Sequence, residues 1–211
     1  MGFKKSTAKI LSENRLFVRS GKILDVGCGK RIYEYIFPEA EYIGIDIETS
    51  GRDANEKLPD IYFDGTNIPF EEDYFDFIVC TEVLEHCKDP KRLLDEMYRV
   101  LKPEGRALIT TPFLWGEHEI PYDFRRYTSY GLTKNILSAN FKIIDFKKDY
   151  PGFSSLLKIA ASELSNSLGD NKSPKFLFAY LLIYIAFKFI EKVLRIKASR
   201  IYLTNQIMIE K

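Results

Sequence analysis

Two acidic residues stand where strand-like apolar segments end, and glycines surround one of them. Asp25 follows Ile23-Leu24 and opens the run Asp25-Val26-Gly27-Cys28-Gly29, and Asp46 closes the next apolar segment, Tyr42 to Asp46. Gly27 and Gly29 allow the backbone to turn tightly and to approach a ligand closely. An acid about twenty residues further on is placed to hold two ribose hydroxyls. The spacing predicts a nucleoside pocket at the edge of a parallel α/β sheet.

The residues around this loop also discriminate between nucleotides. A dinucleotide site needs a third glycine, so that a helix N-terminus can meet a pyrophosphate, and Ile32 stands at that position. Asp25 is unfavourable beside phosphates but favourable beside an ammonium group. S-adenosylmethionine satisfies both conditions, because it carries an α-amino group and a sulfonium but no phosphate. An NAD-type oxidoreductase is disfavoured by Ile32 and by the absence of a nicotinamide-side motif.

Composition sets the class of protein. The chain has 211 residues, 45% of them hydrophobic, which is enough for one domain with a full core and a small appendage. A net charge of +1 gives no indication of a nucleic-acid partner. The three cysteines, Cys28, Cys80 and Cys87, have no metal-ligand spacing, so we predict no metal site and a reducing, cytoplasmic location. The first residues contain no apolar signal region.

Short apolar strands alternate with helical stretches, which is the pattern of a βαβ sheet. The best helix runs from Asp89 to Leu101, with apolar residues at spacings of three and four, and a second runs from Ser129 to Ala139. Lys4 to Arg19 reads as a short amphipathic helix. We expect seven strands, near 22–26, 41–46, 60–63, 74–80, 105–111, 141–146 and 202–209.

The connection before the last strand is far longer than a hairpin requires. We therefore expect a nucleoside-binding sheet domain of residues 1–150 and 200–211, with residues 151–199 as a helical insertion that serves as a lid, a dimer contact or a membrane-surface element. Residues 176–187 are apolar without interruption but shorter than the ~18–20 residues that span a bilayer. A helix over 176–196 with its basic end would form a homodimer or a peripheral membrane contact.

Several motifs occur in one order: Asp25–Gly29, Asp46, Asp64-Gly65-Thr66-Asn67-Ile68-Pro69-Phe70, Thr81-Glu82-Val83-Leu84-Glu85-His86 and Tyr98–Arg106. Over about residues 20–145 the chain resembles the class I S-adenosylmethionine-dependent methyltransferases, most closely the UbiE-like, methyltransferase type 11 subgroup. The resemblance implies a Rossmann-like, seven-stranded, mostly parallel sheet, with the last strand antiparallel and helices on both faces. The cofactor would be S-adenosylmethionine and the product S-adenosylhomocysteine.

The resemblance also implies roles for single residues. Asp25, Gly27, Cys28 and Gly29 would hold the methionine end of the cofactor, Asp46 the ribose and Ile47 the adenine face. Asp64 and Gly65 would bind the adenine edge, and Thr81 would form a wall of the site. The chain departs from the common pattern at Arg31, where many relatives have glycine.

The segment from Thr111 to Thr128 should form a loop over the carboxyl edge of the sheet and resembles the H-x-x-P-x-D-x-x-R-Y-T segment of one methyltransferase subgroup. A hydroxyl or amine acceptor requires a base, and His118 is the candidate, with Asp123 as a reserve base or as the group that orients it. Trp115, Arg126 and Tyr127 are candidates for binding the acceptor. The alternative is that these side chains only tie the loop together.

These observations predict a methyltransferase that transfers a methyl group by direct displacement to a small-molecule or lipid-linked acceptor. The chain has no motif for gripping a flipped base, so we expect no nucleic-acid substrate. The location would be cytoplasmic, with membrane association through 176–196 as an option. The alternative is a catalytically degenerate partner protein that still binds the cofactor.

Overall fold

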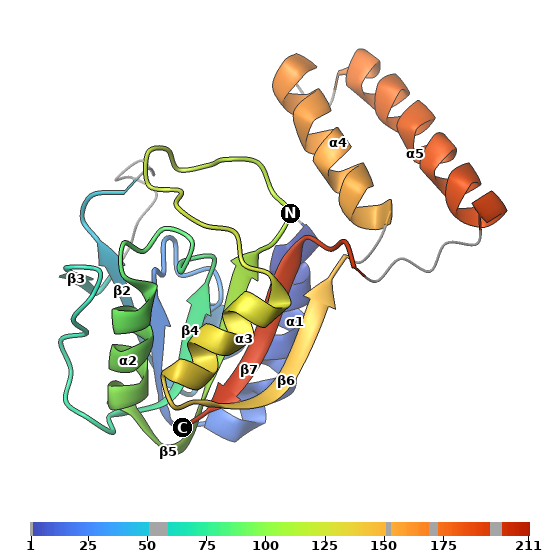
Figure 1. Ribbon diagram of the computed structural model, residues 1–211. Helices are drawn as coiled ribbons and strands as arrows, with labels where there is room; N and C mark the ends of the chain where they lie inside the picture. Colours follow the sequence, from blue (N-terminus) through green and yellow to red (C-terminus); the bar gives the residue numbers. More distant parts are fainter. Residues whose placement is uncertain (1, 51–58, 151–152, 169–172, 195–199) are drawn as a thin grey trace. The chain divides into compact units, whose positions relative to one another are not determined.

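The computed structural model describes residues 2–50, 59–150, 153–168, 173–194 and 200–211. Five α-helices, two short 3-10 helices and seven strands alternate along these residues (Figure 1). The helical elements are α1 (Gly2–Asn14), η1 (Arg15–Val18), η2 (Glu34–Ile36), α2 (Pro90–Val100), α3 (Ser129–Ser138), α4 (Phe153–Leu168) and α5 (Pro174–Leu194). The strands are β1 (Lys22–Val26), β2 (Glu41–Ile47), β3 (Ile61–Phe63), β4 (Phe75–Thr81), β5 (Leu101–Pro112), β6 (Lys142–Asp149) and β7 (Thr204–Glu210).

The strands form one sheet in the order β3-β2-β1-β4-β5-β7-β6. Strands β1 to β5 pair in parallel, and β7 pairs antiparallel with β5, with Arg106 opposite Glu210. This confirms the expected Rossmann-like sheet with an antiparallel last strand. The strand order reverses between β1 and β4, and in open α/β sheets ligands bind at that point, outside the carboxyl ends of the strands.

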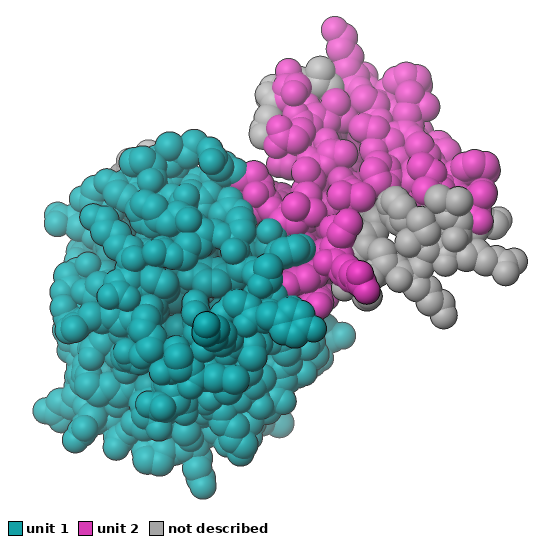
Figure 2. Space-filling model, in the orientation of Figure 1, with its two compact units in different colours: residues 1–113, 117–147, 204–211 teal, residues 114–116, 148–203 magenta. Residues whose placement is uncertain are grey.

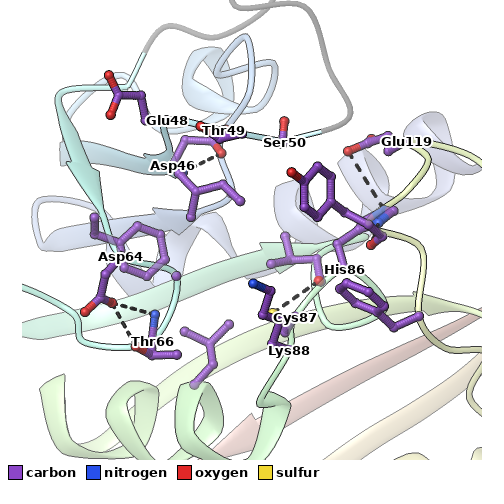
Figure 3. Close-up of a pocket in the computed structure, with 18 of the residues that line it drawn as sticks. Asp46, Glu48, Thr49, Ser50, Asp64, Thr66, His86, Cys87, Lys88 and Glu119 are labelled. Carbon is purple, nitrogen blue, oxygen red and sulfur yellow. Dashed lines mark hydrogen bonds and ion pairs between the residues drawn. The ribbon is translucent and has the colours of Figure 1, made fainter.

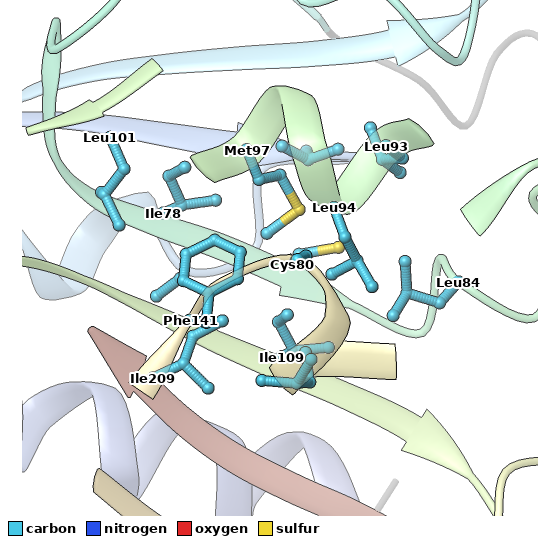
Figure 4. Close-up of a cluster of buried hydrophobic side chains, with 14 of the residues drawn as sticks. Ile78, Cys80, Leu84, Leu93, Leu94, Met97, Leu101, Ile109, Phe141 and Ile209 are labelled. Carbon is cyan, nitrogen blue, oxygen red and sulfur yellow. The ribbon is translucent and has the colours of Figure 1, made fainter. Parts of the chain in front are cut away.

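Alternate residues of each central strand face opposite sides of the sheet, as the period of a strand requires. On β4, Ile78 and Cys80 pack under α2 and α3, while Phe77 and Val79 pack under α1 and the two 3-10 helices. Figure 4 shows the first of these cores, in which α2 supplies Leu93, Leu94 and Met97. Helices therefore cover both faces of the sheet, which holds the carboxyl ends of β1, β2 and β4 in fixed positions.

Helix α2 begins and ends where the sequence indicated. The Asp89 side chain accepts a hydrogen bond from the Arg92 amide at 3.0 Å, and Pro90 takes the first helical position, where no amide donor is needed. Strand β5 begins at Leu101, earlier than the expected 105. Pro103 does not exclude the early start, because the pairing of β4 with β5 shifts register between Phe75 and Phe77 and continues from Arg106.

The chain divides into two compact units (Figure 2). Unit 1 contains Met1–Phe113, Glu117–Lys147 and Thr204–Lys211, and unit 2 contains Leu114–Gly116 and Lys148–Leu203. In unit 2, α4 and α5 pack against each other, and the rings of Phe176, Tyr180 and Tyr184 stack along α5. No helix of the described residues is long and apolar enough to cross a bilayer.

Candidate active site

The loop after β1 has the glycine geometry that its sequence predicted. Gly27 and Gly29 have φ of +67° and +51°, in the left-handed region that favours glycine. The amides of Gly27 and Cys28 both donate to the Ile45 carbonyl, at 2.8 and 3.1 Å. A Cβ at Gly27 would lie 2.5 Å from Cγ2 of Val83, so a side chain there would collide with the turn after β4.

Asp46 ties this loop to the end of β2. Its buried carboxylate accepts hydrogen bonds from the Gly29 amide at 3.0 Å and from the Ile47 amide at 2.8 Å. The amides of Gly27, Cys28 and Gly29 are thus all used within the protein. Residues 30–33 form turns, and only the short η2 follows them, so no α-helix N-terminus faces the loop. This geometry does not offer the amide cradle that a pyrophosphate uses.

A cavity of about 400 Å³ opens at the carboxyl ends of β1 to β4, within the size range of small-ligand and cofactor sites. Figure 3 shows Asp46 and Asp64 on one side of this cavity and His86, Cys87 and Glu119 across from them. The lining residues are Gly27, Asp46, Ile47, Glu48, Thr49, Ser50, Phe63, Asp64, Gly65, Thr66, Glu82, Val83, His86, Cys87, Lys88, Leu93, Glu119, Tyr122 and Phe124.

The structure brings five of the predicted cofactor residues together in this lining: Gly27, Asp46, Ile47, Asp64 and Gly65. Asp25, Cys28, Gly29 and Thr81 are not among the lining residues. Asp25 lies in β1, Cys28 and Gly29 lie in the loop after it, and Thr81 is the last residue of β4.

Asp25 lies beneath the loop. The residue is 2% exposed, and its carboxylate accepts a 2.6 Å hydrogen bond from the Tyr42 hydroxyl. Burial raises the pKa of Asp25 to about 7, although the Tyr42 hydroxyl acts in the opposite direction. This carboxyl group therefore titrates close to neutrality.

The turn after β3 is built on Asp64. One carboxylate oxygen accepts from the amides of Thr66 and Asn67, at 2.7 and 2.6 Å, and the other from the Asn67 side-chain amide at 2.5 Å. These hydrogen bonds lower the pKa of Asp64 far below its usual range, so it stays ionised. Gly65 has a φ of +84°, which suits a tight turn at the cavity wall.

Arg31, the departure from the family pattern, points away from the cavity. Its φ of +53° lies in the left-handed region that favours glycine. Its guanidinium donates to Asp60 at 2.7 Å, to Glu34 at 2.8 Å and to the Tyr42 carbonyl at 3.0 Å. These contacts hold the side chain on the outer edge of β2, and it does not line the cavity.

The far wall of the cavity is formed by the turn after β4 and the loop after β5. The sequence motifs did not predict a ligand contact for the residues of this wall. Hydrogen bonds to carbonyls of the turn hold the loop against it: the Phe124 amide donates to the Glu85 carbonyl at 2.9 Å, and the Arg125 guanidinium donates to the carbonyls of Cys87 and Lys88. The positive φ values of Glu82 (+55°) and Glu119 (+54°) mark backbone strain on both segments. The sequence indicated this wall only indirectly, because both segments follow strands that are neighbours in the sheet and therefore end at the same edge.

His118 lies beside this wall, although it does not line the cavity. Its ring meets that of His86 edge to face, with centroids 4.8 Å apart. Asp123 orients it: one carboxylate oxygen accepts from the His118 amide at 2.9 Å and lies 3.2 Å from Nδ1. Two guanidinium nitrogens of Arg126 bind the same carboxylate at 2.5 and 2.7 Å.

The charges in this cluster keep the Asp123 carboxylate ionised. Burial acts to raise the pKa of Asp123, but Arg126 and the His118 amide outweigh it and lower the pKa to about 2. An ionised carboxylate of that strength is a poor base at neutral pH. The guanidinium of Arg126, expected to bind the acceptor, is engaged by Asp123.

Two further candidates are not among the residues that line the cavity. Tyr127, expected to line the site, is buried in the core under α2 and α3, and its hydroxyl donates to the Leu84 carbonyl at 3.2 Å. An aromatic residue in a loop has the same sequence pattern whether it faces a cavity or the core, which explains the difference. Trp115 belongs to unit 2.

Comparison with known proteins identifies the family. Residues 24–109 match the model of the methyltransferase domain. Demethylmenaquinone methyltransferase of Geobacillus sp. (strain WCH70) is 32% identical over 133 residues, which are 54% of this chain and 56% of that protein. Ubiquinone biosynthesis O-methyltransferase of Thiobacillus denitrificans is 34% identical over 106 residues, 43% of this chain and 44% of that protein. The chain thus spans less than two thirds of the length of each of these relatives.

Among solved structures, the 4+2 cyclase SpnF aligns with a TM-score of 0.63 at 18% identity, covering 98% of this chain and 80% of that one. At this identity the likeness shows a shared fold. The matched domain contains the β1 glycine loop, Asp46, Asp64 and the turn after β4, and the cofactor of its family is S-adenosylmethionine, as the sequence predicted. Residues 24–109 are therefore a methyltransferase domain of the class I S-adenosylmethionine-dependent family.

Proposed function

We propose that the chain transfers the methyl group of S-adenosylmethionine by direct displacement to a small-molecule or lipid-linked acceptor. The observation that carries this proposal is the cavity at the reversal of strand order, where Asp46 and Asp64 face the turn after β4. The cofactor's ribose would lie at Asp46, its adenine between Ile47 and the Asp64-Gly65 turn, and its methionine end along the Gly27 loop above Asp25.

The acceptor would enter from the wall formed by His86, Glu119, Tyr122 and Phe124. This wall combines two aromatic rings with an imidazole and a carboxylate, which suits a planar acceptor that must lose a proton as the methyl group is transferred. We assign the handling of that proton to His118, because Asp123 and Arg126 hold the ring in one orientation next to His86. Holding acceptor and methyl donor in line supplies much of the remaining rate enhancement.

Lipid-linked acceptors are supported by α5. Its exposed apolar residues, which we name the α5 apolar face, are Leu177, Phe178, Leu181, Leu182, Ile185, Phe189 and Val193. Exposed apolar patches of this kind mark membrane or protein contacts. The names of the two relatives, demethylmenaquinone methyltransferase and ubiquinone biosynthesis O-methyltransferase, support starting an acceptor search with quinone-type compounds.

The test is transfer of a radiolabelled methyl group from S-adenosylmethionine to a panel of hydroxylated and demethylated quinones, soluble phenols and amines. The proposal predicts label in at least one acceptor, and a loss of ~10²–10⁴-fold in kcat when His118 is replaced by Ala. Tyr130→Ala, on the exposed surface of α3, is the control and should keep full turnover. A protein that binds the cofactor but labels no acceptor would contradict the enzymatic proposal and favour the partner-protein alternative.

A further inference from the structure

The turn after β4 and the loop after β5 bring together three side chains that are typical metal ligands. Glu85, His86 and His118 each offer a ligand atom, and these atoms all lie within 4.8 Å of one another. Strands β4 and β5 are parallel neighbours, so their carboxyl ends place the two segments side by side. No ligand spacing in the sequence reveals the cluster, because His118 is distant from the other two along the chain.

The carboxylate of Glu85 is the anomalous member of this group. The residue is 0% exposed, and within the described part of the chain neither carboxylate oxygen has a hydrogen-bond partner. Nε2 of His86 is likewise buried without a hydrogen bond, and it lies 3.7 Å from Oε1 of Glu85. A buried charged or polar group without a partner is costly, and such groups are usually paired or coordinate a metal. The Glu85 carboxylate and Nε2 of His86, which both lack a hydrogen-bond partner among the described residues, therefore lie next to each other.

Both histidines are held as metal-bound histidines usually are. Nδ1 of His86 lies 2.9 Å from the Tyr122 carbonyl, which fixes Nδ1 as the donor and leaves the lone pair on Nε2. Nδ1 of His118 lies 3.2 Å from the Asp123 carboxylate, which Arg126 fixes in turn. A carbonyl or carboxylate behind the second ring nitrogen orients a ligating imidazole and raises its basicity.

The charges around the cluster favour a cation. Glu82 and Asp123 are carboxylates near Glu85, and Arg126 is the nearby cation. Arg126 is already bound to Asp123 through two hydrogen bonds. Oε2 of Glu119 lies 4.0 Å from Nε2 of His86 and adds another carboxylate.

We propose that Glu85, His86 and His118 bind one divalent transition metal ion, such as Zn²⁺, Co²⁺ or Mn²⁺, at the acceptor wall of the cavity. Two imidazoles and one carboxylate favour these ions over Mg²⁺ and Ca²⁺, which prefer oxygen ligands. Ligands about 2.1 Å from a tetrahedral ion lie about 3.4 Å apart, so the 3.7 Å between Glu85 and His86 needs little adjustment. A three-ligand site leaves a position open for water or an acceptor oxygen.

The consequence for catalysis rests on the proposed function. Since His86 lines the cavity, the open position of the ion would face the acceptor. A bound cation lowers the pKa of a coordinated hydroxyl, so the acceptor oxygen would lose its proton to solvent more readily before it attacks the methyl carbon. His118 would then act on the proton through the metal, as a ligand, rather than by direct abstraction.

The test measures ion binding by the full chain without cofactor or acceptor, after treatment with a chelator that is then removed. Calorimetric titration with Zn²⁺ should give one ion per chain with micromolar or tighter affinity. Co²⁺ should develop visible absorption bands without the thiolate charge-transfer band that ligation by the nearby Cys87 would produce. Glu85→Gln and His118→Asn should each weaken binding by at least ~10-fold, whereas the surface control Glu13→Gln should leave it unchanged.

Two outcomes would overturn the proposal: no saturable binding below millimolar Zn²⁺, or binding that both ligand variants leave unchanged. If a variant fails to fold, the Co²⁺ spectrum of the unmodified chain still decides the test. A thiolate charge-transfer band, or the absence of any visible band, would also exclude this site. Titration of Glu85→Gln with S-adenosylhomocysteine separates this test from that of the proposed function. Retained cofactor binding with lost ion binding assigns the effect to the metal site alone.

Discussion

Asp25 is a buried acid whose ionisation opposes folding near neutral pH. Its pKa of about 7 lies above the unfolded value of 3.8, so the folded protein binds the proton more tightly between those values. Stability therefore falls as pH rises from about 4 to about 7, and the full penalty remains above pH 7. A carboxylate kept in such a place is consistent with a cationic ligand group nearby, such as the α-amino group of the cofactor.

We predict that Asp25→Asn stabilises the cofactor-free protein at pH 8 by about 1 kcal/mol or more, and has little effect near pH 4. The amide oxygen of asparagine can still accept the hydrogen bond from Tyr42. Urea unfolding at the two pH values measures the difference. Equal destabilisation at both pH values would show that the Asp25 carboxylate is needed for packing and is not penalised by its charge.

At the scale of elements, the β1 loop and the turn after β4 must approach within van der Waals contact. We predict that Gly27→Ala destabilises the protein by about 2–4 kcal/mol, because the methyl group would meet Val83 at 2.5 Å and the backbone has a positive φ. Gly116→Ala is the matched control, since the nearest atom to its added methyl group lies at 3.8 Å. Thermal unfolding of both variants measures the effect, and an unchanged midpoint for Gly27→Ala would contradict the loop geometry.

The elements also show what the sequence could predict. Strand and helix positions followed from hydrophobic period and from local signals such as Asp89-Pro90, because these depend on neighbouring residues. The meeting of Asp46 and Asp64 in one cavity agrees with their positions at the ends of neighbouring strands, while the role predicted for Asp64 came from the family resemblance. The opposite wall, with His86 and Glu119, could not be predicted, because these residues are far apart in sequence and meet only through the pairing of β4 with β5. Tyr127 was misplaced because a loop aromatic gives no signal of which way it faces.

At the scale of the whole molecule, the α5 apolar face is expected to bind a membrane or another protein. We predict that the chain pellets with anionic liposomes at low salt, and that Phe178→Asp and Phe189→Asp together weaken this binding at least ~10-fold, because both rings are about two-thirds exposed. Tyr130→Asp, which changes an exposed aromatic of α3, is the control. Absence of pelleting would exclude a lipid surface as the partner of this face. A dimer that forms in sedimentation experiments and dissociates in the double variant would show instead that the face binds a second copy of the chain.

The central claim is that the cavity at Asp46 and Asp64 holds S-adenosylmethionine. Calorimetric titration of the purified chain with S-adenosylmethionine and S-adenosylhomocysteine, with NAD as the competing nucleotide, tests it most directly. We predict micromolar binding of both sulfur compounds, no binding of NAD, and loss of binding by at least ~100-fold in Asp46→Ala, while the control Glu39→Ala on the surface binds normally. A folded protein that binds neither compound, or an Asp46→Ala variant that binds both unchanged, would contradict the account.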